Sequence, residues 1–478
     1  MKRNIPLIVD LDGTLIRTDM LCESFLIAIR NNLLVILFVF FWIFYGRNFL
    51  KYKLAQYASN LDVDLLPFNA ELISWLKCEK KKSRVIILCT ATHKIIADQI
   101  GMHLGLFNEI FSTNDNLNLS GRNKAKFLKK QFGLKGFDYI GNSFADINVW
   151  KIARYAYGVN ISNFLAKYFQ NKFKFKFLFS RTSGLALQCF YVLRTHQWLK
   201  NLILFIPLFA SHQFLNFSLW YDLFLSFISF SFCASAVYIF NDFLDIESDR
   251  QHPSKKNRPF ASGHLPIIYG IFISSILLIL SFNLAFLVNG HFKYWLLSYF
   301  AIASGYSLLF KKIVLLDCFV LSLLYTIRIL AGFEAAHLLN SFWLLAFSVF
   351  LFLSLAFIKR YAEIEISIFE GKQLLKGRGY YTSDATLIHT LGIASGYSAT
   401  LILALYLNSD SVSSLYSSSY FIWVNIPLLL FWISWMWLKA HRGEMNDDPI
   451  IFALKDKISI FAGLFFVFFL FLGTLNPS

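Results

Sequence analysis

The chain has 478 residues, of which 56% are hydrophobic, 18% aromatic and only 15% charged. A soluble body of this size needs more polar surface than that composition supplies, so we expect a membrane to be part of the solvent. The formal charge of +16 would suit a nucleic-acid-binding protein, but membrane proteins also gather Lys and Arg in cytoplasmic loops, and we expect no nucleic-acid partner.

The first residues, MKRNIPLIVDLDGT, place two basic residues before an apolar run that ends at Val9. This run is too short for a signal peptide, so we expect a buried strand and an N-terminus that stays in the cytoplasm. Short apolar runs alternate with charged amphipathic stretches through residues 1–165, at 7–10, 85–90, 137–142 and 155–160. The alternation predicts an α/β Rossmann-like domain with parallel strands joined by helices.

Two segments of this half have unusual composition. Residues 33–45, LLVILFVFFWIFY, are apolar throughout but fall short of the roughly 20 residues that span a bilayer. We expect a cap helix near 31–45 that dips into the membrane interface rather than a crossing, which would invert the topology of the second half. Residues 166–187 alternate Lys with Phe, which predicts a basic amphipathic linker on the membrane surface, with a strand as the alternative.

Residues 188–478 form a series of apolar stretches near the length of a membrane span. We expect an all-α domain of nine transmembrane helices, at about 188–210, 219–240, 266–288, 293–310, 313–332, 342–358, 386–407, 420–438 and 457–475. With a cytoplasmic N-terminus, nearly all Lys and Arg of the loops fall on the inner side, as the positive-inside rule demands. The count therefore predicts a multi-pass protein of the plasma (inner) membrane with its N-terminal domain and active sites on the cytoplasmic side.

The strand end VDLDGT carries Asp10 and Asp12, whose side chains point the same way from an extended backbone. In a carboxylate-nucleophile phosphatase the first such Asp attacks phosphorus, and the second protonates the leaving oxygen and later activates water. Later residues that could hold a phosphoryl group and Mg²⁺ are Thr90, Lys124, Asn142 and Asp146.

Together these motifs resemble the haloacid dehalogenase (HAD) phosphatase superfamily over residues 1 to about 160. The resemblance implies Asp10 as nucleophile, Asp12 as acid/base, Thr90 and Lys124 as phosphate binders, and Asp10, Asp12, Asn142 and Asp146 around the metal. Asn142 stands where such enzymes often carry Asp, and Thr92 lies two residues from Thr90. A degenerate domain kept for folding or regulation is therefore the alternative.

The strongest signal is NDFLDIESDRQHPSKKNRPFASG. Asp242, Asp245 and Asp249 stand at i, i+3 and i+7, which keeps three carboxylates on one face of a helix. They would repel one another at a membrane-proximal helix end, so Mg²⁺ carrying a diphosphate is the expected partner. Lys255, Lys256 and Arg258 follow and would meet the remaining phosphate oxygens. A solvated acidic loop, the alternative, does not explain the helical register.

NDxxDxxxD with HPxKxxRPxASG, preceded by RTHQWLKN, resembles the UbiA superfamily of intramembrane prenyltransferases. The likeness covers essentially all of 190–478 and is closest to the phosphoribosyltransferase branch. It implies Mg²⁺-dependent transfer of 5-phosphoribose from phosphoribosyl diphosphate (PRPP) to a polyprenyl phosphate, with Asp242 and Asp245 as catalytic metal ligands joined by Asp249. Substrate-binding roles follow for Lys200, Asn241, Lys255, Lys256, Arg258, Tyr306, Lys311, Arg328, Lys359 and Arg360.

Users of prenyl diphosphates in this superfamily typically add a second acidic motif, where this chain has Asp317 alone beside Lys311 and Lys312. A single acidic cluster with surplus cations suits a diphosphate plus a lipid phosphate. Prenyl transfer to an aromatic or lipid acceptor stays as one alternative, and a membrane transporter as another. The transferase product would carry a 5-phosphate monoester, which we expect the HAD-like domain to remove.

Overall fold

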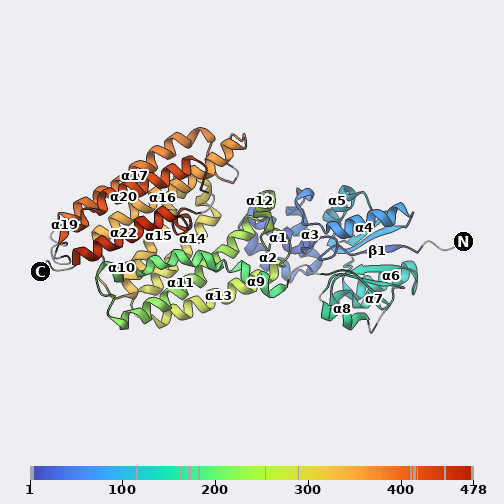
Figure 1. Cartoon of the computed structure of the whole chain (residues 1–478). Coiled ribbons are helices and arrows are strands. Elements are labelled where there is room, and N and C mark those ends of the chain that lie inside the picture. The colour runs from blue at the N-terminus through green and yellow to red at the C-terminus, as the bar shows by residue number, and fades with distance from the viewer. Residues whose placement is uncertain are drawn as a thin grey trace. The chain divides into compact units, whose positions relative to one another are not determined.

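The computed structural model describes residues 5–114, 117–161, 163–170, 172, 174–180, 184–252, 255–288, 290–375, 377–409, 412, 416, 418–445 and 448–474. The chain divides into two compact units (Figure 1). The first unit comprises Met1–Val192 with Asp242–Phe272, and the second comprises Leu193–Asn241 with Ile273–Ser478. The segment that carries the acidic motif, Asp242–Phe272, therefore belongs to the same unit as the N-terminal α/β domain.

The first unit is built on a six-stranded sheet whose strand order is β3-β2-β1-β4-β5-β6. All neighbouring strands pair in parallel. The strands are β1 (Leu7–Val9), β2 (Ile86–His93), β3 (Glu109–Thr113), β4 (Asp138–Gly141), β5 (Ala156–Ile161) and β6 (Phe175–Ser180). This confirms the predicted parallel α/β domain.

The strand β6 differs from the linker expected at 166–187. It pairs in parallel with β5, so the sheet extends into this segment. Phe175 is buried, whereas Lys176 is exposed and lies over the Tyr155 ring, 4.8 Å from its centroid. An alternation of Phe and Lys has the period of two that places one face of a strand in a core and the other in water. The strand alternative thus describes residues 175–180.

Helices cover both faces of this sheet. Leu7 and Val9 pack in one buried cluster with Leu72 of α4, while Ile8 packs in the opposite cluster with Leu128 of α6. The helices of the first 192 residues are α1 (Met20–Asn31), α2 (Val35–Phe44), α3 (Arg47–Tyr57), α4 (Ala70–Lys81), α5 (Lys94–Leu104), α6 (Gly121–Phe132), α7 (Ile147–Trp150), α8 (Asn163–Gln170) and α9 (Leu185–Val192).

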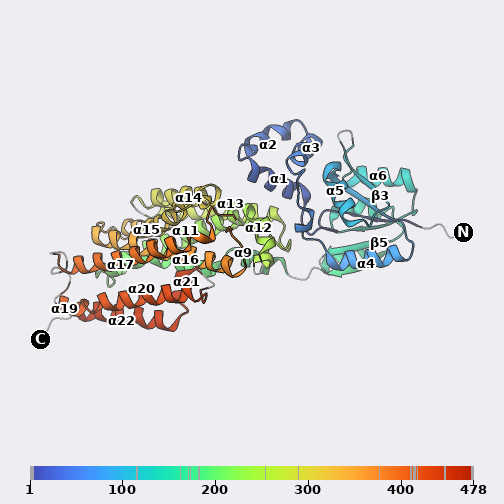
Figure 2. The same ribbon diagram turned by 90° about the horizontal axis from the view of Figure 1, so that it is seen from above.

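Helices α1, α2 and α3 form a cap inserted between β1 and β2, drawn as a separate dark-blue group in Figure 2. Asp19 caps the N-terminus of α1, accepting hydrogen bonds from the backbone N–H groups of Leu21 (2.8 Å) and Cys22 (3.4 Å). Helix α2 has ten apolar residues, of which only Val35 is buried. Ten residues reach about 15 Å, half of a bilayer core, so α2 is too short to cross a membrane.

The second half contains seven helices that are long and apolar enough to span a bilayer, counted over the described residues. They are Phe217–Leu244 (α11), Ile267–Leu287 (α13), Leu316–Ala335 (α15), Phe342–Phe369 (α16), Thr382–Leu407 (with α17, Ala385–Leu407), Tyr420–His441 (with α20, Asn425–His441) and Lys457–Thr474 (α22). The chain is therefore a multi-pass membrane protein.

The other two of the nine expected spans have different shapes. The segment expected at 188–210 is broken into α9, the 3₁₀ helix η3 (Thr195–Phe205) and α10 (Ile206–Ala210). Helix α14 (Phe292–Leu308) has 17 residues. Short helices α12 (Ile246–Gln251) and α21 (Pro449–Ala453) lie in the connections, whereas α19 (Ser419–Ile422) overlaps the start of the span Tyr420–His441. Nine crossings thus stay a prediction.

Candidate functional site

The phosphatase-like motif lies at the carboxyl end of β1. Asp10 directly follows this strand and accepts a hydrogen bond from Lys124 Nζ at 2.7 Å. Lys124 Nζ also donates to the Tyr139 hydroxyl (3.1 Å), which in turn donates to Asp146 Oδ1 (2.8 Å). The sheet therefore joins Asp10, Lys124 and Asp146 through one buried chain of hydrogen bonds, and Tyr139 is a member that sequence reasoning missed.

Asp12 lies where the chain leaves the sheet for the cap. Its Oδ1 accepts from the backbone N–H of Met20 (2.8 Å), at the start of α1. Its Oδ2 accepts from the hydroxyl of Thr92 at 2.7 Å and from that of Thr90 at 3.4 Å. Both threonines of the ambiguous pair thus face Asp12, and Thr92 makes the shorter contact.

The loop after β4 wraps one carboxylate in backbone donors. Asp146 Oδ2 accepts from the N–H groups of Asn142 (3.0 Å) and Ser143 (3.1 Å). Gly13 has a φ of +71°, and a Cβ there would lie 2.0 Å from the side-chain nitrogen (Nδ2) of Asn142. The positive φ favours glycine at this turn, and a larger residue would also require the Asn142 side chain to move.

The electrostatics of this site favour a bound cation. Burial raises the pKa of Asp10 to about 7; Lys124 opposes the shift, and the charges of Asp146 and Asp12 add to it. Mutual repulsion among carboxylates is relieved by a divalent cation, and carboxylate and amide oxygens are ligands that suit Mg²⁺. The oxygen ligands that such a cation prefers are present in Asp10, Asp12, Asn142 and Asp146. Among the described residues, however, no three His, Cys, Asp or Glu side chains lie close enough together to form a metal site as they stand.

The acidic motif lies at the end of α11 and in α12, in the first unit. Helix α11 ends at Leu244 and α12 begins at Ile246, so the helical register breaks at Asp245. Arg258 Nη1 nevertheless bridges Asp242 Oδ1 (3.1 Å) and Asp249 Oδ2 (2.6 Å). Burial raises the pKa of Asp249, and Arg258 opposes that shift. Two of the three predicted carboxylates thus converge on one predicted cation, while Lys255 and Lys256 are exposed in a 3₁₀ turn.

A second set of charges holds this acidic loop against the cap. Arg250 Nη2 pairs with Glu23 Oε1 of α1 at 2.5 Å, and both side chains are almost wholly buried. The Arg250 Nε donates to the Ala261 carbonyl at 3.0 Å. At the exposed edge, Arg30 pairs with Glu247. The sequence motif gave no signal for these contacts, since Glu23 lies 227 residues from Arg250.

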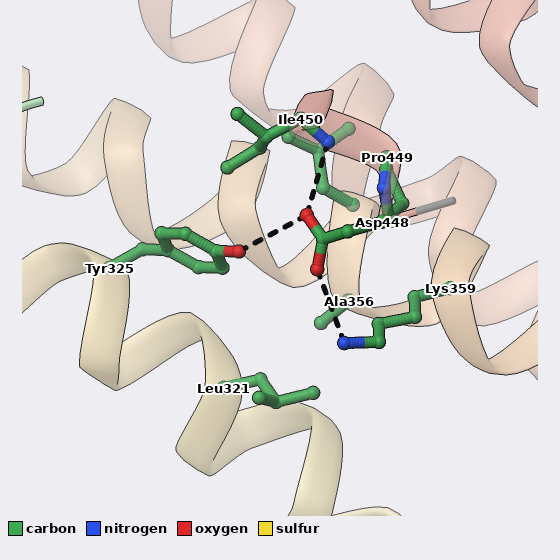
Figure 3. A pocket seen from close by; sticks show the side chains of 8 residues that line it. Leu321, Tyr325, Ala356, Lys359, Asp448, Pro449 and Ile450 are labelled. Atoms are coloured by element: carbon green, nitrogen blue, oxygen red, sulfur yellow. Dashed lines mark hydrogen bonds and ion pairs between the residues drawn. The ribbon is translucent and has the colours of Figure 1, made fainter. Parts of the chain in front are cut away.

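In the second unit, one carboxylate whose side chain is 10% exposed contacts two of the lysines predicted to bind substrate. Asp448 Oδ2 lies 2.8 Å from Lys200 Nζ of η3 and 3.1 Å from Lys359 Nζ of α16. Burial would raise the pKa of Asp448, but the two lysines more than offset it and hold that pKa well below its usual range. Figure 3 shows Tyr325 and the Ile450 N–H directed at Oδ1 of the same carboxylate. Asp448 is a further residue that sequence reasoning did not single out.

A narrow pocket opens beside this carboxylate, lined by Leu321, Tyr325, Leu355, Ala356, Lys359, Asp448, Pro449 and Ile450. Arg328 lies on the next turn of α15 after Tyr325 and donates to the Asn201 side chain (2.9 Å) and the Tyr299 hydroxyl (3.1 Å). Elsewhere in the unit, Lys311 Nζ donates to Asn241 Oδ1 at 3.4 Å. The predicted binders are thus distributed over several groups rather than one.

Arg360 and Tyr306 belong to a separate network. Arg360 is fully buried and pairs with Asp317 and Glu363. Arg378 lies 3.2 Å from the Glu363 carboxylate and donates to the Tyr306 hydroxyl at 2.9 Å. Since two carboxylates already neutralise Arg360, this residue acts in the structure as a link between α15 and α16.

Comparisons with known proteins bear on the whole chain. The UbiA prenyltransferase family matches residues 202–470. An uncharacterized protein, y4nM of Sinorhizobium fredii, is 34% identical over 463 residues, 96% of this chain and 89% of that protein. The nodulation protein NoeC of Azorhizobium caulinodans is 36% identical over 56% of this chain and 87% of its own length.

A decaprenyl-phosphate phosphoribosyltransferase of Corynebacterium glutamicum is 32% identical over 58% of this chain and 83% of that enzyme. The family match covers more than half of the chain, including Asp242, Lys359 and Asp448. The similarity to y4nM extends across the N-terminal α/β domain as well. The chain therefore belongs to the UbiA prenyltransferase family.

Proposed function

We propose that the membrane domain transfers 5-phosphoribose from PRPP to a polyprenyl phosphate and that the N-terminal domain then removes the 5-phosphate. The observation that carries the transfer step is the group of Lys200, Lys359 and Asp448, in a chain with 32% identity to a decaprenyl-phosphate phosphoribosyltransferase. Two lysines around a single carboxylate leave net positive charge, which suits an anionic acceptor such as a lipid phosphate better than a neutral ring.

In the transfer step, the acidic motif holds the diphosphate of PRPP. Asp242, Asp245 and Asp249 would be the Mg²⁺ ligands, and the bound cation would neutralise charge that develops on the leaving diphosphate. A lipid phosphate oxygen forms the new bond to C1 of the ribose as the C1–diphosphate bond breaks. The lipid phosphate is already anionic at neutral pH, so the step needs no general base.

The cations divide between the two anions. Arg258, which bridges Asp242 and Asp249, would turn to the diphosphate with Lys255 and Lys256. Lys200 and Lys359 would hold the lipid phosphate, and their release from Asp448 would be compensated by the new anion. Asn241, Lys311, Arg328 and Tyr306 are proposed as further contacts, whereas we leave Arg360 out because two carboxylates already bind it.

The phosphatase step uses the carboxylates at the end of β1. Asp10 attacks the phosphorus of the 5-phosphate to form an aspartyl-phosphate, and Asp12 donates a proton to the leaving ribose oxygen. Asp12 then accepts a proton from the water that releases inorganic phosphate. Lys124, 2.7 Å from Asp10, and the hydroxyls of Thr90 and Thr92 would bind phosphoryl oxygens. Asp10, Asp12, Asn142 and Asp146 would hold Mg²⁺.

Helix α2 supports a lipid-borne substrate for that domain. Its exposed side chains include Leu37 (62%), Phe40 (63%) and Phe44 (75%). An apolar face of this kind is suited to lie in the interface of a bilayer. We propose that α2 rests on the cytoplasmic face of the plasma membrane, where a substrate that cannot leave the bilayer can reach Asp10.

The test uses purified protein in liposomes with PRPP, decaprenyl phosphate and Mg²⁺, and follows lipids by mass spectrometry. Wild type should form decaprenyl-phosphoryl ribose, and Asp10→Asn should accumulate the same lipid with a 5-phosphate. The surface variant Asp64→Asn should match wild type, since the Asp64 side chain is 80% exposed. Product that depends on a prenyl diphosphate instead of PRPP would overturn the transfer step; identical lipids from Asp10→Asn and wild type would overturn the phosphatase step.

A further inference from the structure

A lysine of the cap reaches the phosphatase site. Lys51 of α3 donates from Nζ to the Ala91 carbonyl at 2.7 Å and to Asn118 Oδ1 at 3.2 Å. Ala91 lies between Thr90 and Thr92, the two threonines that face Asp12. The cap therefore delivers an ammonium group to the carboxyl end of β2, a contact that no motif in the sequence predicts.

This ammonium lies in an acidic field. Burial lowers the pKa of Lys51, and the charges of Asp12 and Asp19 oppose that shift. Desolvation, followed by the charge of Asp12, raises the pKa of Asp19 to about 6. With Asp10 and Asp146 nearby, carboxylates outnumber the cations of the site. A doubly charged phosphate ester needs more positive charge than Lys124 alone supplies, even with one divalent cation.

A second cation follows on the same helix. Arg47 stands four residues before Lys51, one turn along α3. Its positive charge contributes to the lowered pKa of Lys51. Arg47 is exposed, and the described residues include no ion-pair partner for it. It lines a surface hollow with Tyr45, Gly46, Asn48, Phe49 and Tyr52. The basic face of α3 thus runs from the phosphatase site to this hollow.

We propose, on the basis of the proposed phosphatase function, that Lys51 and Arg47 bind a second anionic group of the substrate, the phosphodiester that joins the sugar to its lipid. Lys124 already contacts the nucleophile Asp10 and serves the scissile phosphate. Lys51 has three N–H donors, of which the described residues occupy two, so one is left for a ligand. The substrate class is therefore a sugar phosphate with a second anion and an apolar tail.

Two soluble probes separate this role from a structural one. Ribose 5-phosphate has one anionic group, and its derivative with a methyl phosphodiester at C1 has two. Lys51→Met should raise KM for the two-anion probe by about 10- to 100-fold, the effect of one charge-assisted hydrogen bond, and leave ribose 5-phosphate little changed. Arg47→Gln should act in the same direction, and Lys51→Arg should restore most of the binding.

The matched control is Lys77→Met in α4, because Lys77 is exposed and lies on a helix that does not line this hollow. It should leave both probes unchanged. Equal losses on the two probes in Lys51→Met, or no loss on either, would overturn the second-anion role. Asp10→Asn should abolish turnover of both probes; if it does not, the phosphatase function itself fails.

Discussion

Asp448→Asn should destabilise the membrane domain far more than its conservative shape suggests. The substitution keeps the volume of the side chain and removes its charge, so Lys200 and Lys359 lose their shared counter-ion. The side chains of Asp448 and Lys200 are 10% and 8% exposed, so their charges have little access to water. Removing one partner of a buried ion pair costs about 3–5 kcal/mol, which for a domain of this size lowers Tm by about 10 °C.

The assay is thermal unfolding in detergent, with Glu444→Gln as the matched control. Glu444 pairs with Lys439 at the surface, where its side chain is 45% exposed, and such pairs contribute about 0–1 kcal/mol. Since the pKa of Asp448 is lowered, its contribution is complete above about pH 4 and is lost only as pH falls through the lowered pKa. The loss of Tm should therefore be the same at neutral and mildly acidic pH. Equal Tm values for Asp448→Asn and Glu444→Gln would refute the reasoning.

Three further outcomes are expected. Asp242→Asn should abolish PRPP-dependent lipid transfer while the protein still folds in detergent, because it removes a proposed metal ligand and Arg258 keeps Asp249 as a partner; full activity would contradict the metal site. Phe40→Asp, at a position 63% exposed in α2, should slow dephosphorylation of the lipid substrate in liposomes but not that of soluble ribose 5-phosphate. A variant that matches the wild-type rate on the lipid substrate would exclude membrane docking. Gly13→Ala should lose phosphatase activity because a Cβ would meet Asn142 at 2.0 Å, whereas Gly133→Ala, also at positive φ but with open space around it, should retain activity.

Sequence patterns predicted the elements whose environment is simple. Parallel strands are buried on both faces and read as short apolar runs, so β1, β2, β4 and β5 lie where the sequence placed them. The Lys–Phe alternation at 172–177 could not be assigned in the same way. A period of two fits both a membrane-surface segment and a strand, and the deciding fact is that β5 offers an edge for pairing.

The residues of the candidate sites also differ in whether the sequence alone could reveal them. Motif residues such as Asp10 and Asp242 could be named because their spacing is local and their chemistry specific. Asp448 and Lys51 were missed because each makes its contacts with residues far along the chain; Lys51, for example, lies 40 residues from Ala91. The substrate-binding role of Arg360, which rests on its place in a motif, stays a prediction. Its pairing with Asp317 and Glu363 depends on helix packing that composition does not reveal.

The broken first segment of the membrane half connects these observations. Hydropathy predicts one helix over 188–210, yet the chain takes a left-handed conformation at Arg194 (φ +50°) and continues as a 3₁₀ helix of 11 residues. Such helices seldom exceed 3–4 residues, and a left-handed non-glycine residue costs about 1–2 kcal/mol.

Polar contacts made by the broken segment offset that cost. Lys200 reaches Asp448, and Asn201 donates to the Ser231 hydroxyl (3.0 Å) and accepts from Arg328 (2.9 Å). Irregular backbone at membrane depth is tolerated where protein or a polar cavity surrounds it rather than lipid. The break therefore marks the part of the domain where polar side chains enter the apolar core, and the proposed transfer to a lipid phosphate would use the Lys200 cation placed there.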